Sequence, residues 1–150
     1  MIQVVDSRQK MLSNDQIIEI AGANANQGLP MNRIKDMIRV EMAMPNTWKM
    51  RHGNTIFLGH KTMTPGAGFF RALNADTDQN YIQNVRVFMQ AAYYSGFDLM
   101  VTQFRDPSVL NVFRSALNGA PPEMGCAIQK TNGGYQVTLK LGQKRTGAPE

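Results

Sequence analysis

An apolar strand placed between two helical patterns is the feature that most constrains how this chain can fold. Ile82, Val85 and Ala92 recur at helical spacing, and Gly96 follows them as a residue that ends a helix. The next run, DLMVTQF at residues 98–104, is nearly all apolar, which is typical of a strand buried on both faces. A helix that leads into such a strand predicts a domain in which helices cover a mixed sheet.

A further helix and a hairpin follow the apolar strand. Asp106 is placed to cap this helix, and Pro107 fits its first turn. The residues expected to face the core are Val109, Leu110, Phe113 and Leu117. The segment CAIQKTNGGYQVTLKL then reads as two strands, with Asn132-Gly133-Gly134 as the turn. These elements predict that the sheet closes with an antiparallel pair.

The first part of the chain predicts a strand and two helices. IQVV at residues 2–5 fits a short strand. Ser13 can cap the helix that follows, because Gln16 stands three residues later, as in a capping box. A second helix is expected from Met31, and Pro45 stops it.

Three strands are expected in the middle of the chain. Gly53-Asn54 is a hairpin turn signal between two β-prone runs, and FFRALNA at 69–75 fits a third antiparallel strand. The full order is strand, two helices, three strands, helix, strand, helix and hairpin, without an internal repeat. We therefore expect an α+β (α/β) fold with a mixed, mostly antiparallel sheet of about six or seven strands and about four flanking helices. One domain is expected over residues 1–141, followed by a flexible tail over 142–150.

Composition excludes several other classes of protein. Of the 150 residues, 43% are hydrophobic and 18% are charged, as in a folded globular domain. No run of about 18 apolar residues occurs, and the N-terminus lacks a long apolar segment, so neither a membrane span nor a signal peptide is expected. Cys126 is the single cysteine, so no disulfide can form within the chain, and a reducing compartment is expected. Cys126, His52 and His60 alone cannot form a standard zinc site, so no metal is expected.

The net charge of +5 permits contact with nucleic acid, an anionic cofactor or an acidic protein. The basic residues are scattered, however, with a mild cluster only at KLGQKR, residues 140–145. No nucleic-acid-binding motif accompanies them, so we do not expect direct nucleic-acid binding. The 11 methionines fit the filling of an irregular core, with an assembly surface as the alternative.

The element order resembles the GCN5-related N-acetyltransferase (GNAT) fold over nearly the whole chain. The most specific part is residues 80–141, where GNAT proteins also have a helix ending in Gly, an apolar strand, an Asn- or Asp-started helix and two strands. Within this fold the chain is similar to the small acetyltransferase-like proteins of T7-like podoviruses, in its NTIFLGHK hairpin and its GGYQVTLKL strand. The resemblance implies a phage protein that contacts other phage structural proteins, as an oligomer within a particle. It implies a location in the host cytoplasm during assembly and in the virion.

The resemblance also implies a pyrophosphate site, which this sequence does not repeat. GNAT enzymes hold the acyl-CoA pyrophosphate at a glycine-rich turn before the long helix, where backbone N–H groups and the helix dipole meet the phosphates. The matching window, residues 76–84, contains no glycine and places Asp76 and Asp78 beside the anion. Both aspartates are better interpreted as N-cap residues. If the cofactor binds, the candidate residues are Arg71, Arg86, Asn80 and Tyr81.

The groups that would move protons in a GNAT enzyme are also missing. Many members carry a tyrosine on the last helix, and the matching residue here is Phe113, which has no proton to donate and fits core packing. GAGFFRALNAD offers no Glu as a general base. His52 and His60 lie at the expected hairpin and are interpreted as surface residues rather than bases.

Three functions stay open. The first is a catalytically degenerate acetyltransferase-like protein with a structural or virion-assembly role, without catalytic residues or a cofactor. The alternative is an active acyl-CoA-dependent N-acetyltransferase with a divergent pyrophosphate turn and acetyl-CoA as its cofactor. The third is a module that binds a host enzyme or nucleic acid through its basic surface. The bulky Phe69, Phe70 and Tyr81 are expected to fill the opening where GNAT proteins admit the cofactor, which favours the first.

Overall fold

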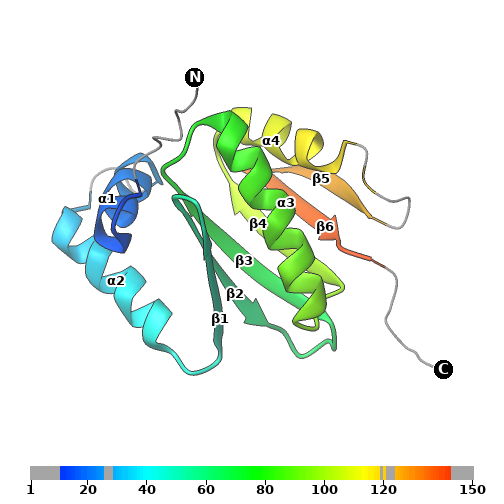
Figure 1. The fold of residues 1–150 in the computed structure, drawn as a ribbon, viewed down its shortest axis with the longest axis horizontal. Helices are drawn as coiled ribbons and strands as arrows, with labels where there is room; N and C mark the ends of the chain where they lie inside the picture. Colours follow the sequence, from blue (N-terminus) through cyan, green and yellow to red (C-terminus); the bar gives the residue numbers. More distant parts are fainter. Residues whose placement is uncertain (1–10, 26–28, 119, 121–123, 143–150) are drawn as a thin grey trace, which may run out of the picture.

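The computed structural model describes residues 11–25, 29–118, 120 and 124–142 and contains four helices and six strands in this part of the chain (Figure 1). In chain order they are α1 (Asn14–Ala25), α2 (Met31–Ala43), β1 (Thr47–His52), β2 (Thr55–Lys61), β3 (Ala67–Asn74), α3 (Asp78–Tyr94), β4 (Leu99–Phe104), α4 (Ser108–Leu117), β5 (Gly125–Thr131) and β6 (Gly134–Lys140). The strand expected at 2–5 lies outside the described residues, as does the tail from residue 143. No helix of the described part is long and apolar enough to cross a membrane.

The six strands form one mixed sheet in the order β1-β2-β3-β4-β6-β5. All neighbouring strands are antiparallel except β3 and β4, which are parallel because α3 connects them as a crossover. The parallel pair is short: it runs only from Ala67–Leu99 to Phe69–Val101, whereas β4 and β6 pair along all of β4. The mixed, mostly antiparallel sheet with four helices confirms the expected fold class.

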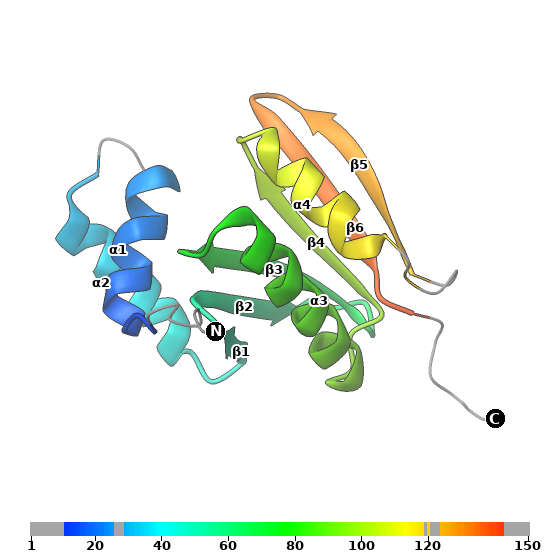
Figure 2. The same cartoon turned by 45° about the horizontal axis from the view of Figure 1, so that its top comes forward.

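Two pairs of helices cover the sheet from opposite faces. Side chains alternate along β2, so Phe57 packs in the cluster that includes α3 and α4, while Ile56 and Leu58 pack with α1 and α2. Figure 2 shows α1 and α2 beside the β1–β2–β3 side of the sheet and α3 and α4 along its middle. The sheet therefore has one large core under α3 and α4 and a smaller one under α1 and α2.

Phe88 of α3 lies at the centre of the larger core. Its ring stacks on Phe57 with centroids 4.4 Å apart and lies 4.7 Å from Phe70 and 5.9 Å from Trp48. It has no solvent exposure. One aromatic ring of α3 thus contacts β1, β2 and β3 and fixes the helix on the sheet.

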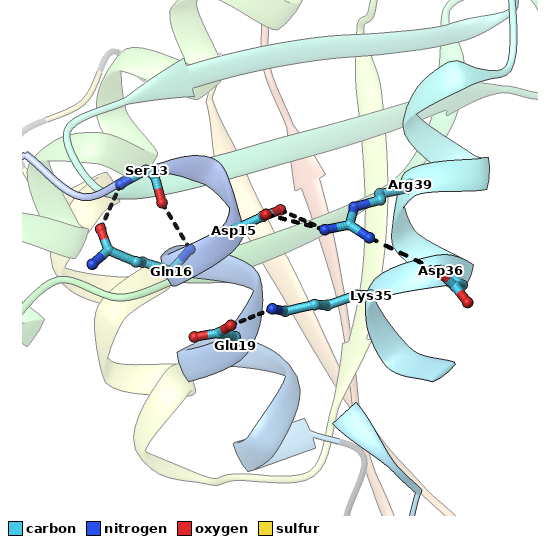
Figure 3. Close-up of polar contacts among 7 residues, drawn as sticks. All are labelled: Ser13, Asp15, Gln16, Glu19, Lys35, Asp36 and Arg39. Atoms are coloured by element: carbon cyan, nitrogen blue, oxygen red, sulfur yellow. Dashed lines mark hydrogen bonds and ion pairs between the residues drawn. The ribbon is translucent and has the colours of Figure 1, made fainter. Parts of the chain in front are cut away.

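The capping box expected at the start of α1 is confirmed (Figure 3). The N–H of Ser13 donates to Gln16 Oε1 at 2.8 Å, and the N–H of Gln16 donates to Ser13 Oγ at 3.1 Å. Figure 3 also shows ion pairs that join the exposed sides of α1 and α2, between Lys35 and Glu19 and between Arg39 and Asp15. The two helices therefore form an antiparallel hairpin held by a buried apolar side and an outer charged side.

Three turn predictions are confirmed by backbone geometry. Gly53, Gly96 and Gly133 have φ of 57°, 110° and 92°, in the left-handed region that favours glycine. They lie at the β1–β2 hairpin, after α3 and at the β5–β6 hairpin.

One detail of the sequence prediction was wrong. β4 is not buried on both faces: Met100 is fully buried under the helices, but Leu99 is 37% exposed, because α1 and α2 do not extend over β4. The expected start of α4 is confirmed: Asp106 Oδ1 accepts from the Ser108 N–H at 2.9 Å, and Pro107 between them has helical φ and ψ of −63° and −20°. The expected core side of α4 is confirmed, with Phe113 fully packed in the larger core.

We predict that Phe88→Ala lowers the free energy of unfolding by about 3–5 kcal/mol, because it removes the ring shared by three strands and leaves a cavity. Urea unfolding followed by circular dichroism measures this. The control is Phe69→Ala, since Phe69 is 55% exposed on the same sheet and should change stability by only about 0.5 kcal/mol. Similar losses for both variants would show that Phe88 is not the centre of the core.

Candidate functional site

The first part of the candidate site is the place where β3 and β4 separate. Beyond the Phe69–Val101 pair the two strands are no longer bonded to each other. On the face of the sheet that α3 and α4 cover, aromatic rings connect the two strands. Phe113 of α4 lies 6.1 Å from Phe70 of β3, edge to face, and stacks at 5.9 Å on Phe104 of β4. Phe70 and Phe113 are buried. Apolar rings therefore fill the space between the separating strands on the face that α3 and α4 cover.

The three bulky residues expected to fill this opening do not lie on the same face of the sheet. Phe70 and Tyr81 belong to the larger core, and burial raises the pKa of the Tyr81 hydroxyl, which keeps it protonated. Phe69 points to the other face of the sheet, because neighbouring residues of a strand alternate, and is 55% exposed. The prediction that Phe113 is a core residue is confirmed, since its ring is 1% exposed.

The second part of the candidate site is the N-terminus of α3. The N-cap residue is Thr77, whose side chain accepts from the Asn80 N–H at 3.4 Å, so the interpretation of Asp76 and Asp78 as N-caps was wrong. Asp78 lies in the first turn of the helix. The side chain of Asp76 instead turns to the β1–β2 hairpin, where it accepts from the Asn54 N–H at 2.8 Å.

Asp76 is the acceptor of a group of buried and half-buried polar side chains, which we call the hairpin–α3 cluster: Asn54, Thr55, Asn74, Asp76 and Asn84. Asn84 Nδ2 donates to Asp76 Oδ2 at 2.7 Å and to Thr55 Oγ1 at 2.9 Å. Thr55 Oγ1 donates to Asn74 Oδ1 at 2.8 Å, and Asn54 Nδ2 donates to Asp76 Oδ1 at 3.2 Å. Asn54, Thr55 and Asn84 are at most 3% exposed. The cluster joins the hairpin, the end of β3 and α3 in one hydrogen-bond network.

His52 contacts this cluster from the surface. Asn84 uses its Nδ2 for Thr55 and Asp76, so the atom that lies 2.9 Å from His52 Nδ1 is the carbonyl oxygen, which can only accept. Neutral His52 therefore carries its proton on Nδ1 and presents Nε2 as an acceptor. The expectation that His52 is a surface residue is confirmed by its exposure.

The two candidate arginines lie on opposite faces of the sheet. Arg86 of α3 donates from Nε to Ala116 O at 3.2 Å and from Nη2 to Ser115 O at 2.8 Å, so it binds the last carbonyls of α4. Arg71 alternates with the buried Phe70 and points to α2, where its Nη2 lies 3.6 Å from Glu41 Oε1. Asn80 and Tyr81 are consecutive in the first turns of α3. The four residues proposed for cofactor binding are therefore not brought into one site.

A second group of polar and charged residues was not expected from the sequence. Glu41 of α2 accepts from His60 Nε2 at 2.6 Å and pairs with Arg71, so helix α2 is linked to β2 and β3. These residues are far apart in the chain, and only the packing of α2 brings them together. Within the described residues, no group of His, Cys, Asp and Glu side chains could hold a metal ion.

Cys126 lies beside a shallow hollow between α4 and β5. The hollow has a volume of about 390 Å³ and is lined by Arg114, Ser115, Leu117, Asn118, Gly125 and Cys126. Burial raises the pKa of the Cys126 thiol, and the charge of Arg114 lowers it by a smaller amount. A raised pKa leaves less thiolate, so this thiol is a poor nucleophile.

We predict that Asp76→Asn lowers the free energy of unfolding by about 1–3 kcal/mol, because an amide N–H₂ would face donors that now share two carboxylate oxygens. Thermal and urea unfolding measure the loss. Asp78→Asn is the matched control, since Asp78 is exposed in the first turn of the same helix and should cost less than about 1 kcal/mol. Equal effects would mean that the hairpin–α3 cluster does not stabilise the fold.

Comparison with known proteins supports the fold and no closer relation. No family model matches the chain, and no curated protein sequence matches it. An uncharacterized protein from Bacillus halodurans has a similar structure, with a TM-score of 0.57 and 9% identity over 87% of this chain and 82% of that chain. Aminoglycoside acetyltransferase AAC(6')-Ib, solved in complex with coenzyme A and kanamycin, has a TM-score of 0.54 and 10% identity over 87% of this chain and 92% of that one. An acetyltransferase of the GNAT family from Streptococcus pneumoniae has a TM-score of 0.46 with 7% identity, over 87% of this chain and 97% of that chain. With the six-stranded mixed sheet and four helices of its described residues, the chain has a GNAT-like, acetyltransferase-like fold.

Proposed function

We propose that this chain uses the GNAT-like fold as a binding scaffold and does not transfer acetyl groups. The observation that carries the proposal is the N-terminus of α3. Asp76 and Asp78 lie at or next to its first turn, and the carboxylate of Asp76 is bound to the β1–β2 hairpin. By the resemblance described above, this is the place where a GNAT enzyme holds pyrophosphate.

Electrostatics disfavours a diphosphate at this helix end. A helix N-terminus attracts anions through its unpaired N–H groups and its dipole. Here the Thr77 side chain accepts from the Asn80 N–H, and the acidic side chain of Asp78 lies in the first turn. A carboxylate within about 4–6 Å of a phosphate raises the free energy of the bound anion. No glycine lies between Ala75 and Asn84 to let the backbone approach a phosphate.

Two further contacts support a role without catalysis. Phe113 occupies the position at which many GNAT enzymes carry a proton-donating tyrosine, and its ring packs between Phe70 and Phe104. Arg86, the candidate for phosphate binding on α3, already binds the carbonyls of Ser115 and Ala116. Releasing Arg86 for a phosphate would leave the end of α4 without this partner.

A scaffold needs surfaces for partners, and α2 offers one. Met37 and Val40 lie along its outer side and Met44 follows its last residue, and they are 53%, 65% and 49% exposed. Exposed apolar residues of this kind are typical of protein–protein contacts, and methionine adapts to varied partners. The resemblance to podovirus proteins extends the proposal to a structural or virion-assembly role, with other phage structural proteins as partners.

The alternative is an active N-acetyltransferase that holds acetyl-CoA with backbone groups of β3 and α3. The similarity in fold to an acetyltransferase solved with coenzyme A favours it. In that case Arg71 or Arg86 would lie near the phosphates. The geometry offers only one of them on the α3 side, Arg86.

We predict that isothermal titration calorimetry with acetyl-CoA and with CoA shows no saturable binding up to about 1 mM ligand, because the helix N-terminus carries carboxylates. Micromolar affinity would overturn the scaffold proposal. In that outcome Arg86→Ala is the next variant: a loss of more than about tenfold in affinity, or about 1.4 kcal/mol, would support the enzyme. Unchanged affinity would mean that the ligand does not contact Arg86.

We also predict that Phe113→Tyr lowers stability and creates no activity. A hydroxyl placed in the ring cluster has no partner and costs about 1–3 kcal/mol. The measurement is urea unfolding together with release of CoA thiol from acetyl-CoA in the presence of primary amines. Leu117→Ala, another substitution on α4, controls for loss of packing alone. Amine-dependent thiol release by Phe113→Tyr would show that only the acid had been lost.

A further inference from the structure

One half of the sheet has a face that no described helix covers. Met100, Val137 and Leu139 point into the larger core under α3 and α4. The residues that alternate with these three along β4 and β6 point to the opposite face of the sheet. The smaller core under α1 and α2 includes residues of β2 and β3 but none of β4, β5 or β6. We call this surface the open face and define it by Phe69, Leu99, Val101, Gln103, Gln136, Thr138 and Lys140.

The centre of the open face is apolar. Phe69 of β3 is 55% exposed, and its partner in the parallel register is Val101 of β4. Leu99, two residues before Val101 on the same face, is 37% exposed. A phenylalanine ring that lies exposed on a flat sheet, beside two aliphatic side chains, is a surface on which another planar group can stack.

Cations lie on both sides of the ring along the strands. Arg71 follows Phe69 by two residues on β3, and its side chain is 50% exposed. Lys140 of β6 is exposed and pairs with Leu99, whose partner Ala67 precedes Phe69 by two residues. The two cations are thus separated by four residue positions, or roughly 13 Å, along the strand direction.

The remaining side chains of the open face are the amides of Gln103 and Gln136 and the hydroxyl of Thr138, and none is acidic. Gln103 Nε2 donates to Gln136 Oε1 at 3.1 Å, and each amide retains a further donor or acceptor for a ligand. At the margin, the carboxylate of Glu41 already pairs with His60 and with Arg71.

The chemistry of the open face selects its occupant. A second copy of this chain would bring the same net charge of +5, and residues 143–150 carry Lys144 and Arg145 against the single Glu150, so neither supplies the negative charge that Arg71 and Lys140 favour. A partner with negative charges and exposed planar groups fits better. In a nucleic-acid single strand the base faces are available for stacking on an aromatic side chain, and the phosphates bind cations.

We propose that the open face binds single-stranded nucleic acid without sequence preference. One base stacks on Phe69, backbone phosphates lie at Lys140 and Arg71, and the amides of Gln103 and Gln136 bond to base edges. The sequence did not predict this because Arg71 and Lys140 are scattered along the chain and meet on one face only through the strand order. This inference does not depend on whether the chain transfers acetyl groups, so acyl-CoA calorimetry and nucleic-acid binding give separate answers.

Fluorescence anisotropy of labelled single strands of roughly 12 nucleotides, as DNA and as RNA, tests the proposal at low salt. We expect saturable binding to single strands and weaker binding to the matching duplex. Phe69→Ala should weaken single-strand binding by about 5- to 150-fold, as expected for the loss of one base stack. Phe69→Trp should retain binding, and its added fluorescence should be quenched by the strand, with Trp48 in the wild type as the reference.

Matched variants separate stacking from charge. Lys140→Gln should reduce the slope of log affinity against log salt by about 0.7, as expected for one phosphate contact to a single strand. Tyr94→Ala, at an aromatic side chain that is 77% exposed on α3, should leave affinity unchanged. Thermal unfolding of each variant establishes that it is folded.

Three outcomes would overturn the proposal: no binding at low salt, duplex binding as tight as single-strand binding, or Phe69→Ala without effect in a folded protein. Binding of poly-glutamate that equals single-strand binding would assign the open face to an acidic protein partner instead.

Discussion

The carboxylate of Asp76 joins parts of the chain that are far apart in sequence. It accepts hydrogen bonds from Asn54 at the β1–β2 hairpin and from Asn84 in α3. The N–H of Leu12, just before α1, donates to Asn54 Oδ1 at 2.8 Å, so the start of α1 is tied to the same place. Asp76 is half-buried, and a carboxylate withdrawn in part from water needs hydrogen-bond donors, which the hairpin turn and Asn84 supply. Asp76 thus ties the start of α3 to the β1–β2 hairpin, while Phe88 fixes the middle of the same helix on three strands.

The sequence was informative where the signal is local. The capping box at Ser13, the hairpin at Gly53-Asn54 and the helix end at Gly96 each depend on a few neighbouring residues, and all three are present in the structure. Residue type alone does not reveal long-range partners. Asp76 has the composition of a helix cap, but a hairpin twenty-two residues away supplies its donors, and Thr77 takes the cap. Likewise, the apolar run of β4 indicated a strand but not which neighbours cover it. Leu99 is exposed because α1 and α2 end over β3.

The alternation of side chains along a strand would have improved the prediction of the candidate site. In FFRALNA, Phe69 and Phe70 cannot share a face, nor can Phe70 and Arg71. Once Phe70 is placed in the core with α3, Arg71 and Phe69 must point away from that helix. Arg71 and Arg86 therefore could not both hold a cofactor on the α3 side. The contact of Arg86 with the end of α4, by contrast, had no signal in the sequence, because it depends on the packing of two helices against each other.

The same alternation of side chains gives the sheet two faces with different chemistry. Under α3 and α4, Phe70, Phe104 and Phe113 fill the space where the parallel strands separate, so a ligand there would have to displace packed rings. Displacing packed side chains from a core costs several kcal/mol. On the other face, Phe69 and Leu99 are exposed and cost nothing to cover. The exposed large apolar side chains of the described sheet, Phe69 and Leu99, therefore lie on the side opposite α3. Binding there can be gained or changed by surface substitutions that leave the core intact.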